Sequence, residues 1–298
     1  MASESWSFDG QPLSFYVGGN KIWDLRTWNG LDNVPGVNIS GSGSGSSSGT
    51  NGMFQLAQSH GEFWYPQYYT ATTKLLTMHV TSNNMSTGAP GASIDACRQN
   101  FDLNFDTLTR IFGRRRNLST VLRSMSDGSV RKALVTVDAV NNPVLVPPTD
   151  ALITVELTMP DSFWRDATDT TLQTVAAAFS GVLTSFAAAT APMNDLQFNI
   201  TGPVTNPRIT DNESGSWVQY TGTVAAGKVL VLHNTNMGID DGGSGWAPVL
   251  GNMVHAGDSN WLTLYPSVVN GGVSITFGGT ATSGATALAI VGHKKYMR

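Results

Sequence analysis

The side chains that most often perform chemistry are few in this chain, and they form no recognised catalytic motif. The histidines are scattered, and no two are spaced to share one helical face. They are His60, His79, His233, His255 and His293. A Ser/His/Asp triad needs no adjacency in sequence, but matches to the GxSxG elbow fall only in a low-complexity Gly/Ser run. Neither a zinc site of the HExxH type nor an activated nucleophile is expected.

The other reactive side chains also lack partners of the right kind. Cys97 is the single cysteine, which excludes a disulfide framework and a multi-cysteine zinc site, and we expect it to be a small buried residue. The run Asp240-Asp241-Gly242-Gly243 could ligate Ca²⁺, but a solvated turn is the simpler interpretation. The sequence therefore predicts no catalytic residue, no cofactor and no metal site. A hydrolase is the least favoured of the functions considered.

One basic cluster stands out, at Arg114, Arg115 and Arg116, with Arg110 and Arg123 nearby in sequence. Cations suit the negative end of a helix dipole, so a solvated helix end explains the run most simply. The functional alternative is an electrostatic contact with an acidic neighbouring subunit. Nucleic-acid binding ranks third, because one short basic run is weak support in an acidic chain.

Tryptophans in the C-terminal half form the second candidate group. They are Trp217, Trp246 and Trp261, all in the part of the chain that reads as all-β. Aromatic side chains on the faces or loops of a β-sandwich can stack on sugar rings or on a partner protein, whereas the alternative is ordinary packing in the core or between subunits.

Composition sets the broad class. The chain has 298 residues, a net charge of -4, 13% charged residues and 32 glycines. A basic footprint for nucleic acid is absent from these totals. The N-terminus lacks the basic and apolar regions of a signal peptide, and no apolar run reaches about 20 residues. Few charges and many glycines predict a β-rich protein that presents an uncharged surface to other subunits.

The first half of the chain reads as strands with one helix. Aromatic and β-branched residues between glycines predict short strands over 5–39, and a Gly/Ser-rich run at 40–52 predicts a flexible loop. Lys74–Val80 alternates as a strand, and apolar residues at spacings of three and four predict a helix over Asp95–Arg114. Further strands are expected at 119–125, 131–140 and 151–159, with a hairpin turn at Asp127-Gly128.

The second half reads as all-β. Helix and strand compete over 170–191, where alanine favours a helix but threonine and Gly181 favour strands, and we predict strands. Short alternating segments bounded by glycine follow, which is typical of a sandwich or jelly roll. These segments are 196–201, 216–220, 228–233, 261–265, 273–277 and 287–291. The division between the two halves is expected near 160–169.

The order of several motifs resembles one family. Ile200-Thr-Gly-Pro203 leads to Asn206-Pro207-Arg-Ile209, then come a Gly-turn strand from Gly227 and the Leu264-Tyr-Pro266…Asn270 turn. Pro160-Asp161-Ser-Phe163-Trp164 precedes this half. This order is similar to the distal tail protein family of long-tailed, siphovirus-type bacteriophages, which are often minor tail proteins of phages that infect actinobacteria.

The resemblance implies a mainly β fold with an N-terminal β-barrel-like hub domain over 1–165, which contains one helix. It implies a C-terminal galectin-like or jelly-roll β-sandwich over 166–298. The implied product is a hexameric ring in the tail tip or baseplate of the virion, assembled in the host cytoplasm. In a cyclic ring each subunit offers two different surfaces.

The implied partners are other copies of the chain, the tail tube protein, the tape measure protein and the tail-tip hub proteins. DNA would pass transiently through the lumen of the ring, and a neutral or acidic wall suits that passage because it neutralises few phosphates. The alternative function is a carbohydrate-binding tail protein that attaches to host cell-wall glycans through its C-terminal sandwich.

Overall fold

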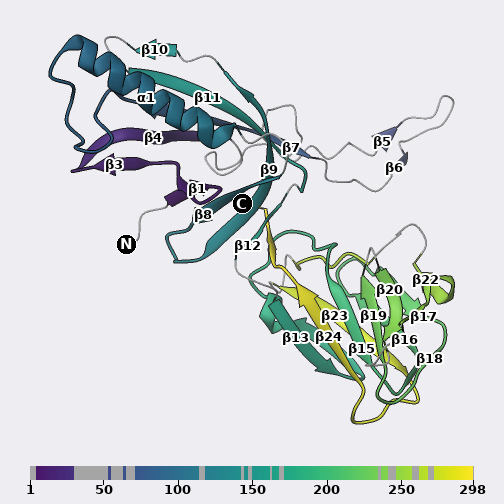
Figure 1. The fold of residues 1–298 in the computed structure, drawn as a ribbon. Helices are drawn as coiled ribbons and strands as arrows, with labels where there is room; N and C mark the ends of the chain where they lie inside the picture. Colours follow the sequence, from purple (N-terminus) through teal and green to yellow (C-terminus); the bar gives the residue numbers. More distant parts are fainter. Residues whose placement is uncertain are drawn as a thin grey trace. The chain divides into compact units, whose positions relative to one another are not determined.

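The chain folds into two compact units, Met1–Ala167 together with Arg298, and Thr168–Met297. They are seen in a computed structural model (Figure 1). The model describes residues 5–29, 53–54, 63–64, 71–113, 118–141, 144–146, 150–161, 163–167, 171–233, 236–240, 246–256, 262–267 and 272–297. The Gly/Ser-rich run at 40–52 lies outside these ranges.

A nearly closed, barrel-like antiparallel sheet forms the N-terminal unit. Its strands follow the order β2-β1-β8-β9-β11-β7-β4-β3, with β10 paired to β11 and β12 paired to β9. The strands are β1 (Ser5–Phe8), β2 (Gln11–Pro12), β3 (Phe15–Val17), β4 (Asn20–Asn29), β7 (Thr72–Val80), β8 (Ser119–Ser124), β9 (Val130–Val140), β10 (Val144–Val146), β11 (Asp150–Met159) and β12 (Trp164–Asp166). A separate hairpin pairs β5 (Met53–Phe54) with β6 (Phe63–Trp64).

Alternation along the strands sorts the side chains between two faces of this sheet. In β7, Leu76, Met78 and Val80 are fully buried, while the residues between them are half-buried. Ile153 pairs with Met78 across β11 and is buried with it. The period of two follows from strand geometry, so the alternating strand predicted for 74–80 is confirmed.

The predicted hairpin between β8 and β9 is also present. The N–H of Gly128 donates to the Met125 carbonyl, and the N–H of Met125 donates to the Ser129 carbonyl. Gly128 has φ 85°, a backbone conformation that glycine adopts without steric cost. The Asp-Gly pair therefore set this turn as its sequence indicated.

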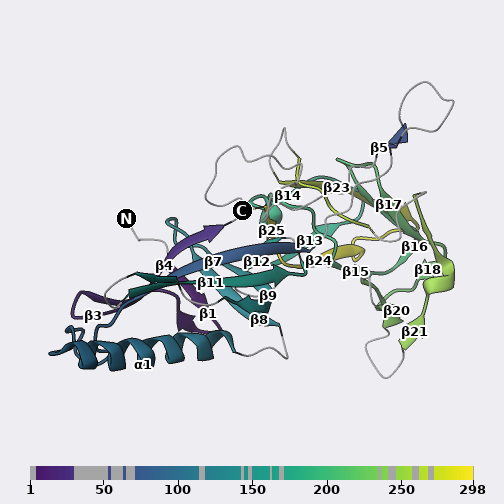
Figure 2. The same ribbon diagram turned by 90° about the horizontal axis from the view of Figure 1, so that it is seen from above.

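Helix α1 (Ile94–Phe112) lies along one side of the barrel sheet (Figure 2). The Ser93 hydroxyl caps its first turn by accepting from the Ala96 N–H at 3.2 Å. Only its C-terminal half is seated on the sheet, through buried Asn104, Leu108 and Phe112. Ile94 was expected on the apolar face but is 71% exposed, because the first turns extend beyond that contact.

The C-terminal unit is a sandwich of two antiparallel sheets. One has the order β13-β24-β15-β19-β20-β21, and the other has the order β14-β23-β16-β17-β22 with β18 paired to β16. Their strands are β13 (Thr171–Ala176), β14 (Phe179–Leu183), β15 (Gln197–Thr201), β16 (Val204–Asp211), β17 (Trp217–Tyr220), β18 (Thr223–Val224), β19 (Val229–His233), β20 (Asn236–Asp240), β21 (Trp246–Pro248), β22 (Met253–His255), β23 (Val273–Thr280) and β24 (Ala287–Gly292). The remaining elements are β25 (Lys295–Tyr296) and the 3-10 turns η2 (Thr184–Phe186) and η3 (Leu250–Asn252).

The two sheets enclose one continuous apolar core. Phe198 and Leu288 from the first sheet and Ile209 and Phe277 from the second are among its fully buried members. Apolar residues facing inward and polar residues facing outward are what a sandwich requires. The predicted mainly β fold, a barrel-like unit with one helix followed by a sandwich, is confirmed.

One local prediction in this unit was wrong, and another, strands over 170–191, was right only as far as Leu183. Segment 261–265 forms no strand in its described part: Leu264 makes only an isolated bridge with Met193. Strand structure over 170–191 ends at Leu183, where η2 begins. In both segments the alternation of apolar and polar residues was weak. Side chains such as Phe186 and Leu264 are buried in the core without a long ladder of β-strand hydrogen bonds.

Candidate functional site

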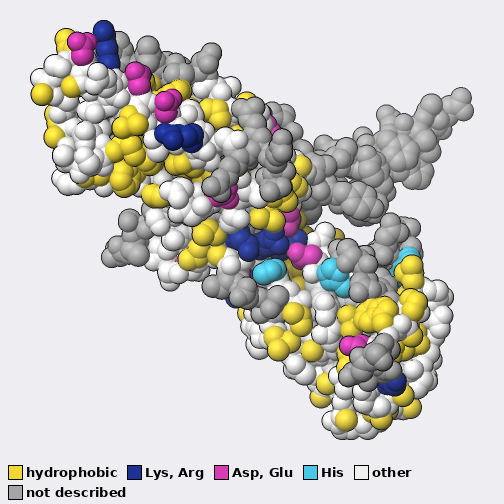
Figure 3. Space-filling model, viewed as in Figure 1, with side chains coloured by type: hydrophobic (Ala, Val, Ile, Leu, Met, Phe, Trp, Pro, Cys, Tyr) yellow, Lys and Arg dark blue, Asp and Glu magenta, His cyan; other side chains and the backbone are white. Residues whose placement is uncertain are grey.

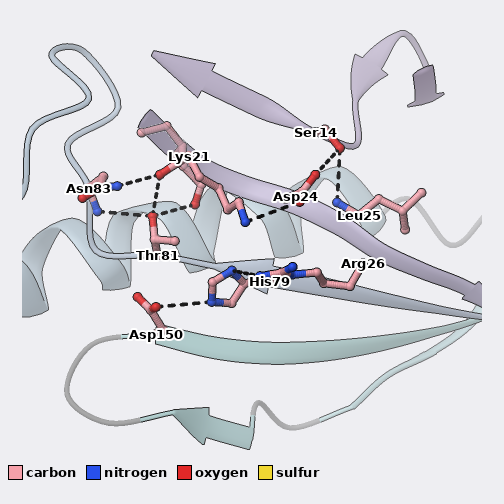
Figure 4. Close-up of polar contacts among 10 residues, drawn as sticks. Ser14, Lys21, Asp24, Leu25, Arg26, His79, Thr81, Asn83 and Asp150 are labelled. Carbon is pink, nitrogen blue, oxygen red and sulfur yellow. Dashed lines mark hydrogen bonds and ion pairs between the residues drawn. The ribbon is translucent and has the colours of Figure 1, made fainter. Parts of the chain in front are cut away.

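The face of the barrel sheet opposite α1 carries a cluster of charged side chains at the β4–β7–β11 junction (Figure 4). Asp24 of β4 lies directly opposite His79 of β7 in the strand register. The His79 Nε2 atom is 3.3 Å from an Asp150 carboxylate oxygen, and its Nδ1 atom is 3.5 Å from Arg26 Nη2. His79 therefore lies between the Asp150 carboxylate and the Arg26 guanidinium.

Asp24 is held in the ionised form by its neighbours. Its carboxylate accepts a hydrogen bond from the Ser14 hydroxyl at 2.7 Å and lies 3.5 Å from Lys21 Nζ. Burial acts to raise the pKa of Asp24, but the Ser14 hydrogen bond and the Lys21 charge outweigh it and lower the pKa overall. Burial and the charge of Asp24 raise the pKa of the Tyr16 phenol. These groups form a solvated ionic network. The lowered pKa makes the Asp24 carboxylate a poor general acid or base at neutral pH.

A hollow of about 700 Å³ adjoins this cluster within the N-terminal unit. Its lining mixes serine hydroxyls, two aromatic side chains, aliphatic groups and one carboxylate, and includes Trp6, Ser7, Ser14, Tyr16, Asp24 and Leu122. Its one hydroxyl–carboxylate pair is Ser14 with Asp24, and the lowered pKa of Asp24 makes that carboxylate a weak base, so the composition of the hollow suits binding.

The predicted basic cluster is only partly described. Arg114, Arg115 and Arg116 lie outside the described residues, so the structure does not place them. Arg110 is exposed in the last turn of α1, where its Nε donates to the Asp106 carbonyl. Arg123 is only 3% exposed, and its guanidinium lies 4.8 Å from the centre of the Trp6 ring. Arg123 therefore belongs to the interior and adds nothing to a surface patch.

The structure separates the predicted tryptophans. Trp217 is half-buried on β17, and Arg208 lies over its ring at 4.1 Å from the centroid. Trp246 lies on β21 in the other sheet and is 43% exposed. Trp261 is outside the described residues. Trp217 and Trp246 thus belong to different sheets of the sandwich.

Possible metal ligands are scattered over the part of the chain that the structure describes. There, no three His, Cys, Asp or Glu side chains come together as a metal site would require. Asp240 ends β20, and the rest of the Asp240–Gly243 run falls outside the described residues. The described helix lacks the length and apolarity needed to cross a bilayer.

Two buried charges in the sandwich were not foreseen. Asp211 is fully buried; one carboxylate oxygen accepts from the N–H and the hydroxyl of Ser214, and the other accepts from the Tyr265 N–H. Burial raises its pKa despite these hydrogen bonds. Lys295 is 2% exposed and lies 3.5 Å from Asp195. Only the serine three residues after Asp211 hinted at a local turn, and nothing in sequence links Lys295 with Asp195.

Comparisons with known proteins agree at the level of the fold. No protein-family model and no curated protein sequence matches the chain. Among solved structures, the Dit protein of phage SPP1 matches with a TM-score of 0.56 at 10% identity, over 99% of both chains. That protein is described as a paradigm of the hub adsorption apparatus in phages that infect Gram-positive bacteria.

Structures of the phage P2 baseplate in its activated conformation, with Ca or with Sr, also match. They are 8% identical over 97% of this chain and 98% of theirs, with TM-scores of 0.35 and 0.34, too low to carry an argument. The class defined here is therefore a fold: a barrel-like unit followed by a β-sandwich, arranged along the chain as in a phage tail hub protein. The particular relative that shows it is the Dit protein of phage SPP1.

Proposed function

We propose that this chain is a structural protein of a phage tail, a hub at the tail tip or baseplate of the virion. The observation that carries this proposal is the likeness to SPP1 Dit over 99% of both chains. A likeness confined to the sandwich would be weak support, because sandwiches serve many functions. Here both units match in the same order along the chain.

The site chemistry supports a structural role. The charged cluster around His79 and Asp24 is internally paired, and the carboxylate beside the Ser14 hydroxyl has a lowered pKa, which makes it a weak base. The low content of charged residues, 13%, suits a chain whose surface is covered by neighbouring subunits. Figure 3 shows a C-terminal unit whose visible face carries few charged side chains.

The finer parts of the proposal follow from the family resemblance. The chain would form a hexameric ring between the tail tube and the tail-tip hub proteins, in contact with the tape measure protein and with a lumen for DNA. Arg114, Arg115 and Arg116 would contact an adjacent copy. The host would be an actinobacterium, with assembly in its cytoplasm.

Native mass spectrometry with electron microscopy of the purified chain tests this proposal. Six copies of 31.6 kDa give a closed ring of about 190 kDa. Reversing Arg114, Arg115 and Arg116 together to glutamate should abolish the ring, while the matched control Arg98→Glu, on the exposed side of α1, should retain it. A chain that stays monomeric at all concentrations, also when mixed with the tail tube protein, would contradict the ring.

A second candidate function is binding of host cell-wall glycans through the C-terminal sandwich. The specific observation in its favour is the outward position of Trp246, which is 43% exposed. Both functions can reside in one chain, because the ring contact is assigned to the N-terminal unit and the glycan contact to the sandwich.

A further inference from the structure

The outer face of the β13-β24-β15-β19-β20-β21 sheet is almost without charge. The strand registers place its outward side chains in cross-strand rows. One row runs Gly238, Val231, Asn199, Ala289, Thr174, and the next runs Asp240, Val229, Thr201, Ala287, Ala176. These six strands contain no lysine or arginine, and Asp240 is their one carboxylate. A third row carries Gln197, Val291 and Leu172, and Leu172 is 59% exposed at the far edge of the sheet. Apart from Leu172, the face offers mainly small apolar groups, hydroxyls and amides.

A tryptophan lies at one end of this face. Trp246 pairs with Asp240 in the β20–β21 register, two residues along from the pair Gly238 and Pro248 and therefore on the same face of the sheet. Its indole atoms fill the space that a Cβ on Gly238 would occupy. The ring therefore rests directly on the backbone of Gly238, where any other residue would displace it. An aromatic ring seated this way loses little conformational entropy when a ligand stacks on it.

The other described tryptophan of the sandwich is not available in the same way. The Arg208 guanidinium covers the ring of Trp217, 4.1 Å from its centroid, and that ring is half-buried. A sugar ring stacking on that side would first have to displace the cation and lose the cation–π contact. Of Trp217 and Trp246, Trp246 is the one whose ring packs on the backbone of Gly238 and is exposed to solvent.

We infer that Trp246 and the adjoining outer face of this sheet bind a neutral oligosaccharide. This inference rests on the glycan-binding role proposed above for the C-terminal sandwich and names its site and ligand class. The C–H face of a pyranose ring would stack on the indole. Asn199 and Thr201 lie on β15, three strands from β21 and so about 14 Å away, within reach of a short chain of sugars.

The charge and the size of the side chains on this outer face indicate which class of ligand it binds. Phosphate, sulfate or uronate groups need a cation, and these strands carry no lysine or arginine. A protein partner would anchor on several large buried side chains, but the rows hold mainly alanine, threonine, glycine and valine around a single aromatic ring. Amides and hydroxyls that both donate and accept match the hydroxyl groups of a neutral sugar.

The test uses the full chain and measured binding of neutral hexasaccharides. The probes are linear glucan, mannan and galactan hexasaccharides, with a sulfated and a uronate hexasaccharide for comparison. Binding of each probe is measured by isothermal titration calorimetry and by tryptophan fluorescence. We expect at least one neutral probe to bind and neither charged probe to do so. Trp246→Ala and Gly238→Val should each weaken that binding about tenfold or more. Trp246→Phe should retain most of it.

Trp217→Ala is the matched control, a tryptophan of the same unit that should leave affinity within about twofold. Melting temperatures of all variants confirm that they fold, and Trp246→Phe keeps the test decisive if Gly238→Val unfolds. Binding that survives Trp246→Ala refutes the site but leaves the glycan-binding role standing. Absence of binding to every neutral probe refutes both, as does exclusive binding to the charged ones. Ring formation, measured separately on the same variants, reports on the hub role alone.

Discussion

Replacing Asn104 with alanine should loosen the attachment of α1 to the barrel sheet. Asn104 is fully buried, and its amide donates 2.8 Å hydrogen bonds to the carbonyls of Thr81 and Asn83, just after β7. A buried acceptor left without its donor costs about 1–3 kcal/mol of unfolding free energy. Two such acceptors, the carbonyls of Thr81 and Asn83, therefore cost about 2–6 kcal/mol. Alanine returns about 0.6 kcal/mol through helix propensity. It also removes the Asn104 side-chain oxygen, which is buried without a partner.

The balance predicts that the N-terminal unit loses about 1–5 kcal/mol of unfolding free energy. Calorimetry can separate the melting transitions of the two units, and hydrogen exchange of the α1 amides reports on the helix directly. Asn100→Ala is the control, because it lies in the same helix and gives up only a half-buried 3.4 Å contact with Asn84. If Asn104→Ala and Asn100→Ala shift the transition equally, the proposed anchoring is refuted.

Two further predictions concern a turn and a buried acid. Gly88→Ala should lower the unfolding free energy of the N-terminal unit by at least about 2 kcal/mol, because Gly88 has φ 73° and an added Cβ would strike the Val17 carbonyl. The control is Gly128→Ala, at φ 85° with open space around it. It should lower the unfolding free energy by only about 1 kcal/mol in the same melting assay. Asp211 has its pKa raised by burial, so the folded state binds its proton more readily than the unfolded chain. The Asp211 contribution to stability should therefore increase as pH falls through the raised pKa towards the ordinary value near 3.8, and diminish as pH rises again. The melting temperature of the wild type relative to Asp211→Asn should increase from pH 7 to pH 4.5, and a constant difference would contradict this.

Local pattern predicted the parts of the fold that depend on local chemistry. The β7 alternation and the Asp127-Gly128 turn follow from strand period and backbone preference, and both are present. The helix was located by its apolar spacing, but the pattern could not show that only its second half is seated. Ile94 is exposed for that reason.

The candidate sites depend on contacts between distant segments, which spacing alone does not reveal. The Asp24–His79 pairing joins β4 to β7 through a register that a bulge between Leu25 and Thr27 shifts. The seat of Trp246 exists because Gly238 stands on the neighbouring strand. A list of tryptophans could not separate it from Trp217, whose ring is covered by Arg208 from a third strand.

The short strand β21 has a consequence for how the protein behaves when crowded. It is three residues long and lies at the edge of its sheet among the described strands. Pro248 at its end has no N–H to offer, and the bulky Trp246 stands at its beginning. Open sheet edges are templates for aggregation into extended fibrils, and brevity and proline are the usual protections. This edge should resist such growth even at high concentration.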